Sequence, residues 1–348
     1  MDLSAKIKGI KYKPFLCREL EVFDSKHLEK ALSSYASFIL KISKENQVAI
    51  SWWVSAKRTR SYPYARVYDT LSFSGKKITI IPVVKDEGKE GDRDFLQWDT
   101  VSLMSLLGVY VIVAYYSDAV RSKRYRHKIT NQRFDIDYIK EQIKNILSYQ
   151  SDALHWNLEH IDKAGQIAQK ALESYAKISK KLKIEMHSRQ SAENRIAELL
   201  KGKNEFMKLS RMLAEKAQRR ERLTIQPKEH LAGKKAIITI KNYLGGYYYF
   251  TADEARIKGN EVLLIEGKHS KNNSLPSLED IKDGLLKMIL FTNLEDVKVG
   301  SKNYNSVAVL KLTVENYFLE SNLSNSQKKI LFLLRKEAKF NNFKIILS

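Results

Sequence analysis

Two carboxylates and one amine within residues 247–270 could form a metal-dependent site. The segment predicts two short strands joined by a tight turn at residues 258–260, where a glycine precedes an asparagine. Asp253 lies in the first predicted strand, and Glu266 and Lys268 end the second, directly after an apolar run. Because side chains alternate between the two faces of a strand, Glu266 and Lys268 point to the same face, and the hairpin can bring Asp253 beside them. Such a group suits a hard divalent cation and a phosphate.

The strand register decides which acid faces Glu266. If the register differs by one residue, Glu254 takes the place of Asp253. A structural interpretation also stands beside the functional one. Glu266 and Lys268 could form only an exposed ion pair at a strand end, which is worth roughly 0–1 kcal/mol and implies nothing about function.

The hairpin, with its first acid and its acid-x-lysine triplet, resembles the core of the PD-(D/E)xK nuclease superfamily. The whole chain is similar to a type II restriction endonuclease. The separation of Asp253 from Glu266 suits the hairpin of that family, and the resemblance implies that these two acids bind Mg²⁺. It also implies that Lys268 positions or activates the attacking water. One departure from the family pattern is Ala252, which stands where the family name has a proline.

The resemblance also implies an activity and a partner. We expect Mg²⁺-dependent hydrolysis of phosphodiester bonds at a specific sequence in double-stranded DNA, with a 5′-phosphate left at the cut. Restriction enzymes commonly act as homodimers because a two-fold protein matches a palindromic site, so we expect a homodimer. Two alternatives remain: a DNA repair or junction-resolving nuclease on the same core, and a catalytically inactive DNA-binding protein.

Two further residues are weaker candidates for the site. Some relatives of the family draw an additional acid from the helix before the core, which makes Glu215 a candidate third acid. His269 follows Lys268 and could act as a general base. We interpret it as structural or DNA-contacting, because the lysine already takes the usual place of that group.

The composition favours a polyanionic partner. The 348 residues include 61 Lys and Arg against 40 Asp and Glu, which gives a formal net charge of +21. A charge of this size attracts nucleic acid and speeds the encounter with it. The one cysteine, Cys17, cannot form a disulfide within the chain, which fits a reducing cytoplasm. The start of the sequence lacks a signal-peptide pattern and the most apolar stretch, residues 103–116, is too short to cross a bilayer, so we expect a cytoplasmic protein without a membrane partner.

The elements around the hairpin predict a mixed sheet, as expected for the core of the resembled family over about residues 205–348. Ser277 is a suitable N-cap for the helix that follows the hairpin. Asp283 and Lys287 share a face of that helix, and we expect them to form an exposed pair and not a contact with DNA. The predicted elements are a strand over 236–240, the hairpin, a helix over 276–293, a strand over 307–314, a helix over 326–340 and a strand over 343–347.

The amino-terminal part predicts an α/β region of its own. Its pattern is similar to that of the nuclease core. Asp69 stands at the position of the first acid and Lys85 at the position of the lysine. Val83 stands where the second acid should be, so we expect no complete metal site there. The fallback site is Asp69 with either Asp86 or Glu87. The predicted elements are helices over 27–42 and 95–106, strands over 48–54 and 110–116, the latter central, and a hairpin of residues 66–73 and 77–84.

An acidic loop follows the second strand of that hairpin. Four carboxylates could bind a metal there, namely Asp86, Glu87, Asp92 and Asp94. The spacing lacks the glutamate that a calcium-binding EF-hand loop has at its twelfth position. We therefore interpret the Asp86–Asp94 loop as a solvated turn.

Two basic runs with interleaved aromatic residues predict contacts with DNA. Arginine can bind guanine edges in the major groove, and tyrosine can contact phosphate or base. We expect these runs to hold the DNA backbone more than to read its sequence. The candidates are Lys57, Arg58, Arg60, Tyr62, Tyr64 and Arg66 in the first run and Arg124 and Arg126 in the second.

The chain as a whole therefore predicts an α/β fold in three parts. We expect an amino-terminal α/β DNA-binding region over residues 1–134. Residues 135–226 keep apolar residues at helical spacing without a proline, which predicts a helical bridge. A mixed-sheet, restriction-endonuclease-like core is expected over residues 227–348, with the boundary at Gln226-Pro227.

Overall fold

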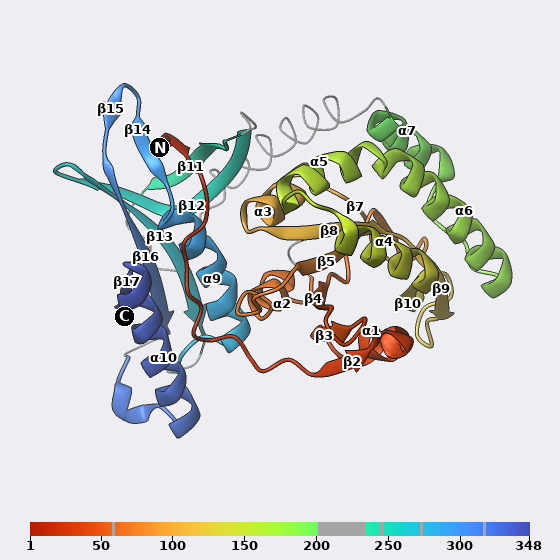
Figure 1. The fold of residues 1–348 in the computed structure, drawn as a ribbon, viewed down its shortest axis with the longest axis horizontal. Coiled ribbons are helices and arrows are strands. Elements are labelled where there is room, and N and C mark those ends of the chain that lie inside the picture. The colour runs from red at the N-terminus through yellow and green to blue at the C-terminus, as the bar shows by residue number, and fades with distance from the viewer. Residues whose placement is uncertain (58–59, 201–233, 244–246, 272–273, 316–317) are drawn as a thin grey trace. The chain divides into compact units, whose positions relative to one another are not determined.

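A computed structural model of the chain describes residues 1–57, 60–200, 234–243, 247–271, 274–315 and 318–348 (Figure 1). These residues form helices and mixed sheets, so the predicted α/β class is confirmed. The chain divides into two compact units: unit 1 contains Met1–Glu19 and Leu213–Ser348, and unit 2 contains Leu20–Met212. No helix in the described ranges has the length and hydropathy that a bilayer crossing requires.

Unit 1 contains one mixed sheet. Its described strands are β1 (Asp2–Lys6), β11 (Lys234–Lys241), β12 (Tyr247–Lys258), β13 (Glu261–Ser270), β14 (Glu295–Val299), β15 (Lys302–Asn303), β16 (Asn305–Val314) and β17 (Lys344–Leu347). They lie in the order β15-β14-β1-β11-β12-β13-β16-β17. β11, β12 and β13 form an antiparallel meander, and β16 and β17 continue the sheet in parallel with β13. The hairpin that carries the predicted site thus lies in the interior of the sheet.

The two described α-helices of unit 1 begin at side-chain caps. Ser277 precedes α9 (Leu278–Phe291), and its hydroxyl accepts a hydrogen bond from the Asp280 backbone N–H at 3.1 Å, as predicted. α10 (Asn325–Asn341) begins with a capping box at Ser324. α9 packs against β13 and β16, which places the residues of this helix beside the strand of the acid-x-lysine triplet (Figure 1).

The predicted order of elements in the carboxy-terminal region is confirmed, with two additions. A hairpin of β14 and β15 lies between α9 and β16 in the chain, and β1 enters the sheet between β14 and β11. Leu3 and Ala5 of β1 are buried, whereas the residues beside them are exposed, as in a strand with one core face. Met1–Glu19 therefore belongs to unit 1, although residues 1–134 were expected to form one region. Leu3 pairs with Ile238, a separation that no local pattern reveals.

Unit 2 contains a five-stranded sheet and two small two-stranded sheets. The large sheet has the order β2 (Val22–Asp24), β3 (Ser37–Lys41), β4 (Gln47–Trp52), β5 (Lys77–Pro82) and β8 (Val109–Ala114). The small sheets pair β6 (Val84–Asp86) with β7 (Arg93–Phe95) and β9 (Tyr116–Arg121) with β10 (Ile129–Phe134). The described α-helices are α1 (Leu28–Ser34), α2 (Pro63–Tyr68), α3 (Trp98–Leu106), α4 (Ile136–Ser148), α5 (Ala153–Asp162), α6 (Ala164–Leu182) and α7 (Arg189–Leu200).

Three element predictions in unit 2 are wrong. Residues 27–42 do not form one helix, because α1 ends at Ser34 and β3 follows it. Residues 66–73 do not form a strand, because α2 reaches into them, and Pro63 at the start of α2 has a backbone angle suited to a first helical turn. A strand does form in residues 110–116, as β8 up to Ala114, but it was expected to be central and lies at the edge of the five-stranded sheet.

The outer edge of β8 is covered by side chains of α5. Asn157 Oδ1 accepts a hydrogen bond from the Val111 N–H at 2.7 Å, and the indole N–H of Trp156 donates to the Val111 carbonyl at 2.9 Å. Buried backbone groups need such partners where no further strand pairs with them. α4 and α6 also pack against β8 and β9. The described part of the predicted helical bridge, residues 135–226, therefore lies within unit 2.

Candidate active site

The β12–β13 hairpin brings three of the predicted site residues together. Asp253 Oδ2 accepts a hydrogen bond from the Gly267 N–H at 2.9 Å. The carboxyl group of Asp253 also lies close enough to that of Glu266 for the two groups to influence each other's pKa. Lys268 Nζ lies 3.2 Å from Glu266 Oε1. Two carboxylates and one amine thus share one face of the sheet, as their spacing predicts.

Glu254 points to the opposite face of β12. Its side chain is fully buried and pairs with Arg256. Successive residues of a strand alternate between faces, so only one of the two neighbouring acids can face Glu266. The pairing of Glu254 with Ile265 sets the register that gives this place to Asp253.

Two residues of α9 complete the group. Asp283 Oδ2 lies 2.5 Å from Lys268 Nζ, and Lys287 Nζ lies 2.6 Å from Glu266 Oε2. Glu266 and Lys287 are only 2% and 6% exposed, so the contacts form an interior network. We refer to Asp253, Glu266, Lys268, Asp283 and Lys287 as the unit 1 cluster.

The prediction that Asp283 and Lys287 form an exposed helix pair is wrong. α9 is buried on most of its surface, and it approaches β13 closely at Gly284. A Cβ atom at Gly284 would lie 3.2 Å from Lys268 Cε. The absence of a side chain at Gly284 therefore gives the aliphatic part of Lys268 room to pass α9. The sequence held a signal for this burial, since residues 285–291 are apolar apart from Lys287, which is typical of a helix buried on all sides.

The two carboxylates of the unit 1 cluster differ in their affinity for protons. Burial raises the pKa of Glu266 to about 7; Lys287 opposes this effect, and the negative charge of Asp253 adds to it. Burial acts in the same direction on Asp253, but the charge of Lys287 and hydrogen bonds with Glu266 and the Gly267 N–H outweigh it and lower the pKa of Asp253. Between the pKa values of the two groups, a proton therefore resides on Glu266 while Asp253 is ionised.

The unit 1 cluster fits the requirements of a hard divalent cation. Mg²⁺ takes oxygen ligands, keeps several waters and uses one or two carboxylates together with substrate phosphate. Asp253 and Glu266 offer two carboxylates on one face. Among the residues that the structure describes, no three His, Cys, Asp or Glu side chains surround a common metal position. A cation at this pair would therefore be completed by water and phosphate.

The weaker candidates have other positions. His269 Nδ1 lies 2.9 Å from the Thr313 hydroxyl, and His269 faces away from its neighbour Lys268 because strand residues alternate. This contact suits the structural one of the two roles, structural or DNA-contacting, that we expected for His269. Glu215, Arg58 and the boundary at Gln226-Pro227 lie outside the described residues.

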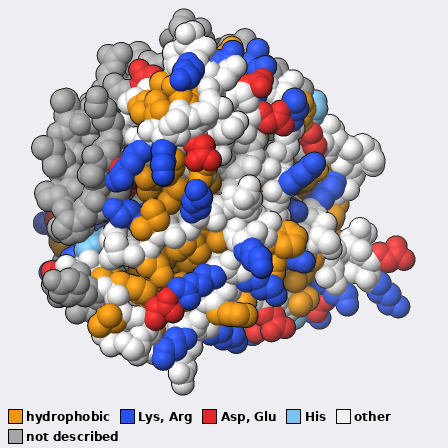
Figure 2. All heavy atoms as spheres, turned by 90° about the vertical axis from the view of Figure 1, so that its left-hand side faces the viewer, with side chains coloured by type: hydrophobic (Ala, Val, Ile, Leu, Met, Phe, Trp, Pro, Cys, Tyr) orange, Lys and Arg blue, Asp and Glu red, His pale blue; other side chains and the backbone are white. Residues whose placement is uncertain are grey.

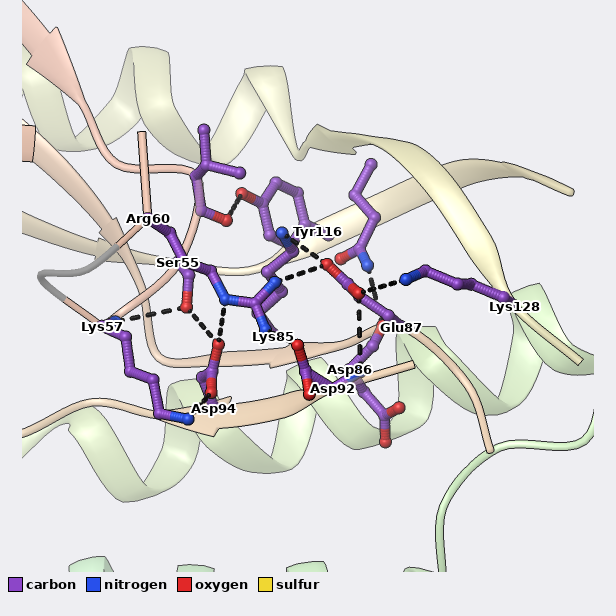
Figure 3. Close-up of polar contacts among 12 residues, drawn as sticks. Ser55, Lys57, Arg60, Lys85, Asp86, Glu87, Asp92, Asp94, Tyr116 and Lys128 are labelled. Carbon is purple, nitrogen blue, oxygen red and sulfur yellow. Dashed lines mark hydrogen bonds and ion pairs between the residues drawn. The ribbon is translucent and has the colours of Figure 1, made fainter. Parts of the chain in front are cut away.

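Two predicted DNA contacts of unit 2 are engaged with acids of the same unit (Figure 3). Arg60 Nε lies 3.0 Å from Asp94 Oδ2, and its terminal nitrogen lies 2.8 Å from Glu87 Oε1. Arg60 also pairs with Asp92. Lys57 Nζ lies 2.7 Å from Asp94 Oδ1. In the structure these cations neutralise nearby carboxylates, which leaves less of their charge for DNA.

The other predicted DNA contacts divide into buried and exposed residues. Tyr64 is 7% exposed. The guanidinium of Arg66 lies 4.6 Å from the ring centre of Trp52 and donates a hydrogen bond to the Trp52 carbonyl at 2.9 Å. Three predicted contacts are exposed, namely Tyr62, Arg124 and Arg126. These three stay candidates for contacts with the DNA backbone.

The Asp86–Asp94 loop is not the solvated turn that its sequence predicted. Lys85 and Lys128 lie 2.9 and 3.1 Å from the carboxylate of Glu87. Burial alone would raise the pKa of Glu87, but these lysines and Arg60 lower it to about 2. We refer to Lys57, Arg60, Lys85, Asp86, Glu87, Asp92, Asp94 and Lys128 as the unit 2 cluster (Figure 3).

The acids of the fallback site have separate surroundings. Asp69 lies at the C-cap of α2 and is 5% exposed. Asp86 lies in β6 and pairs with His187 Nδ1 at 2.7 Å, whereas Glu87 is held by lysines and an arginine. The unit 1 cluster is therefore the stronger candidate for an active site.

No protein-family model, curated protein or solved structure matches the chain.

Proposed function

We propose that unit 1 carries the active site of a Mg²⁺-dependent endonuclease of the PD-(D/E)xK type. The proposed reaction is hydrolysis of phosphodiester bonds at a specific sequence in double-stranded DNA, as in a type II restriction enzyme. The observation that carries the proposal is the meeting of Asp253, Glu266 and Lys268 on one face of the β12–β13 hairpin. The mixed strand order, with β16 and β17 parallel to β13, supports a restriction-endonuclease-like core.

Each residue of the unit 1 cluster has its own part in the proposed reaction. Held by Asp253 and Glu266, Mg²⁺ would supply an activated water and polarise the phosphoryl oxygen. Burial would raise the pKa of Asp253, but Lys287, Glu266, the Gly267 N–H and Lys268 together lower it, so Asp253 offers a negative charge at neutral pH. Lys268 contributes a compact positive charge where negative charge develops on the phosphate. Asp283 orients Lys268 through the contact of 2.5 Å.

The proposed partner is DNA and the proposed assembly is a homodimer. The net charge of +21 favours a polyanion. On the face in Figure 2, hydrophobic side chains gather among lysines and arginines. α10 of unit 1 exposes Phe332 and Phe340 to 66% and 62%. Exposed apolar side chains that gather in this way mark interaction surfaces, which supports contact with a second copy whose two-fold axis would match a palindromic site.

Digestion of DNA of known sequence tests the proposal. The protein with Mg²⁺ is expected to cut at one short sequence, which end sequencing of the fragments maps, and EDTA is expected to stop the cutting. Lys268→Ala should lose cutting and keep specific binding, because its amine acts on the transition state and not on recognition. Cutting of branched junctions without sequence preference would favour a repair nuclease. Specific binding without cutting in Mg²⁺ or Mn²⁺ would favour an inactive DNA-binding protein.

A further inference from the structure

Both oxygens of the Glu266 carboxylate face a lysine. Lys287 Nζ lies 2.6 Å from Oε2, and Lys268 Nζ lies 3.2 Å from Oε1. Lys268 is also held by Asp283 at 2.5 Å. The contact with Lys287 is therefore the shorter of the two that Glu266 makes with lysines, and its lysine is not shared with Asp283. An oxygen that a divalent cation would have to reach is therefore already covered by an ammonium group.

The position of Lys287 is set by the core of unit 1. Its neighbours Leu286 and Met288 on α9 are 1% and 0% exposed, and Lys287 itself is 6% exposed. Burying an ion pair costs desolvation free energy that an apolar side chain in the same place would avoid. A lysine here is therefore better explained by the carboxylate that it contacts than by the stability of the helix.

We propose that Lys287 is a built-in counter-ion, which holds Glu266 in the protein without a divalent cation and leaves Glu266 when the cation binds. This inference rests on the proposed metal site of Asp253 and Glu266. With all three of its carboxyl groups ionised, the unit 1 cluster combines three negative charges with two ammonium groups, so one negative charge is formally in excess. Lysine suits the role because its compact charge sits on a flexible stem that can turn away from the carboxylate.

Competition from Lys287 lowers the affinity of the site for divalent cations when DNA is absent. A cation that binds has to break the 2.6 Å contact and meets repulsion from both ammonium groups. A phosphate at the site gives the displaced ammonium a new anionic partner. DNA and the cation therefore bind cooperatively, and Lys287 couples the two binding events.

Calorimetric titration with Mn²⁺ in the absence of DNA, at one ionic strength and at one pH at which Glu266 is ionised in every variant, tests this role. Lys287→Met is expected to bind Mn²⁺ at least about tenfold more tightly than the wild type, because a competing charge at ion-pair distance is removed. Lys287→Arg is expected to bind more weakly than the wild type, since a guanidinium can hold a carboxylate through two hydrogen bonds. Added Mn²⁺ should also raise the unfolding temperature of Lys287→Met more than that of the wild type.

A charge control is available on α10. Lys336 lies with its amine 4.9 Å from the ring centre of Phe15, and Lys336→Met removes one positive charge from unit 1 at an exposed helix face. Its Mn²⁺ affinity is expected to stay within about twofold of the wild type, because solvent and salt screen exposed charges.

The outcomes separate this inference from the proposed function. Unchanged or weaker Mn²⁺ binding by Lys287→Met would overturn the counter-ion role, and so would tighter binding by Lys287→Arg. Glu266→Gln is expected to lose most Mn²⁺ binding. If Glu266→Gln binds as the wild type does, the metal site itself is wrong and the proposed function fails with it. Should Lys287→Met not fold in EDTA, the titration of Lys287→Arg decides.

Discussion

The two charged clusters of the chain resemble each other in composition but differ in how their charges are balanced. In the unit 2 cluster, lysine and arginine side chains outweigh the burial of Glu87 and lower its pKa to about 2. In the unit 1 cluster, Glu266 is buried beside a second carboxylate, and its pKa rises to about 7. The first arrangement is a network of ion pairs that neutralises the carboxylates of the Asp86–Asp94 loop. The second is a place where a cation relieves repulsion, and such perturbed carboxylates gather at functional sites.

The largest expected effect separates the clusters by activity. Glu266→Gln is expected to lower DNA cleavage by about 10³-fold or more, because a metal ligand at the reacting phosphate is lost. Glu87→Gln is expected to leave the cleavage rate per folded molecule nearly unchanged. Single-turnover cleavage with enzyme in excess measures both rates. An equal loss in the two variants would remove the distinction between the clusters.

The unit 2 cluster is expected to act on the stability of the protein and not on its activity. Arg60→Ala is expected to destabilise unit 2 by about 3 kcal/mol, because Asp94 and Glu87 lose a cationic partner in a buried network. Urea unfolding followed by circular dichroism measures the change. Arg124→Ala on an exposed loop is the matched control, expected within about 0.5 kcal/mol of the wild type. Normal stability with lost DNA affinity in Arg60→Ala would instead assign Arg60 to DNA binding.

The pH dependence of stability should run in opposite directions in the two units. The pKa of Glu266 rises from an ordinary 4.5 to about 7, so the folded state keeps a proton that the unfolded state releases, and unit 1 loses up to about 3 kcal/mol between these pH values. The pKa of Glu87 falls from 4.5 to about 2, so the unfolded state takes up a proton first, and unit 2 loses stability as pH falls through that window.

Unfolding in EDTA at a series of pH values checks both directions. Glu266→Gln should remove the loss of stability above pH 4.5, and Glu87→Gln should remove the loss below it. A difference between wild type and Glu266→Gln that does not change with pH would contradict the protonated state of Glu266.

The smallest expected effect concerns the exposed arginines. Arg124→Ala and Arg126→Ala should each weaken DNA binding modestly and reduce the slope of log K against log salt by about 1, because one phosphate contact is lost. Lys57→Ala is the control, since its amine lies 2.7 Å from Asp94 in the unit 2 cluster. Fluorescence anisotropy at several salt concentrations measures the slopes. A larger change in Lys57→Ala would show that the unit 2 cluster opens toward DNA.

The hairpin and its triplet could be predicted from the sequence because each step of the inference is local. The turn at residues 258–260 and the apolar run before Glu266 define the two strands, and alternation assigns the faces. The apolar run around Lys287 indicates a buried helix, but the contact of Lys287 with Glu266 could not be assigned in this way. A charged residue in a helix normally faces water, and only the packing of α9 against β13 and β16 buries this one.

Contacts between residues far apart in the sequence explain the other features that the sequence did not predict. β1 pairs with β11, which follows it more than 200 residues later, as in the pair Leu3 and Ile238. No local sequence pattern therefore predicts that β1 belongs to unit 1. The Asp86–Asp94 loop is polar enough to predict a solvated turn, yet Arg60 and Lys128 reach it from other segments and neutralise Glu87. Sequence spacing thus identifies acids that can meet, whereas the cations that accompany them depend on the whole fold.

The neighbouring acids Asp253 and Glu254 give the most direct test of a metal-dependent nuclease site in unit 1. They stand on opposite faces of β12, and only Asp253 belongs to the unit 1 cluster, where it accepts a hydrogen bond from the Gly267 N–H and lies beside Glu266. In single-turnover cleavage with Mg²⁺, Asp253→Asn is predicted to lose about 10³-fold or more, while Glu254→Gln keeps most of the rate per folded molecule. Cleavage that survives Asp253→Asn, or that falls equally in Glu254→Gln, would contradict the proposed site.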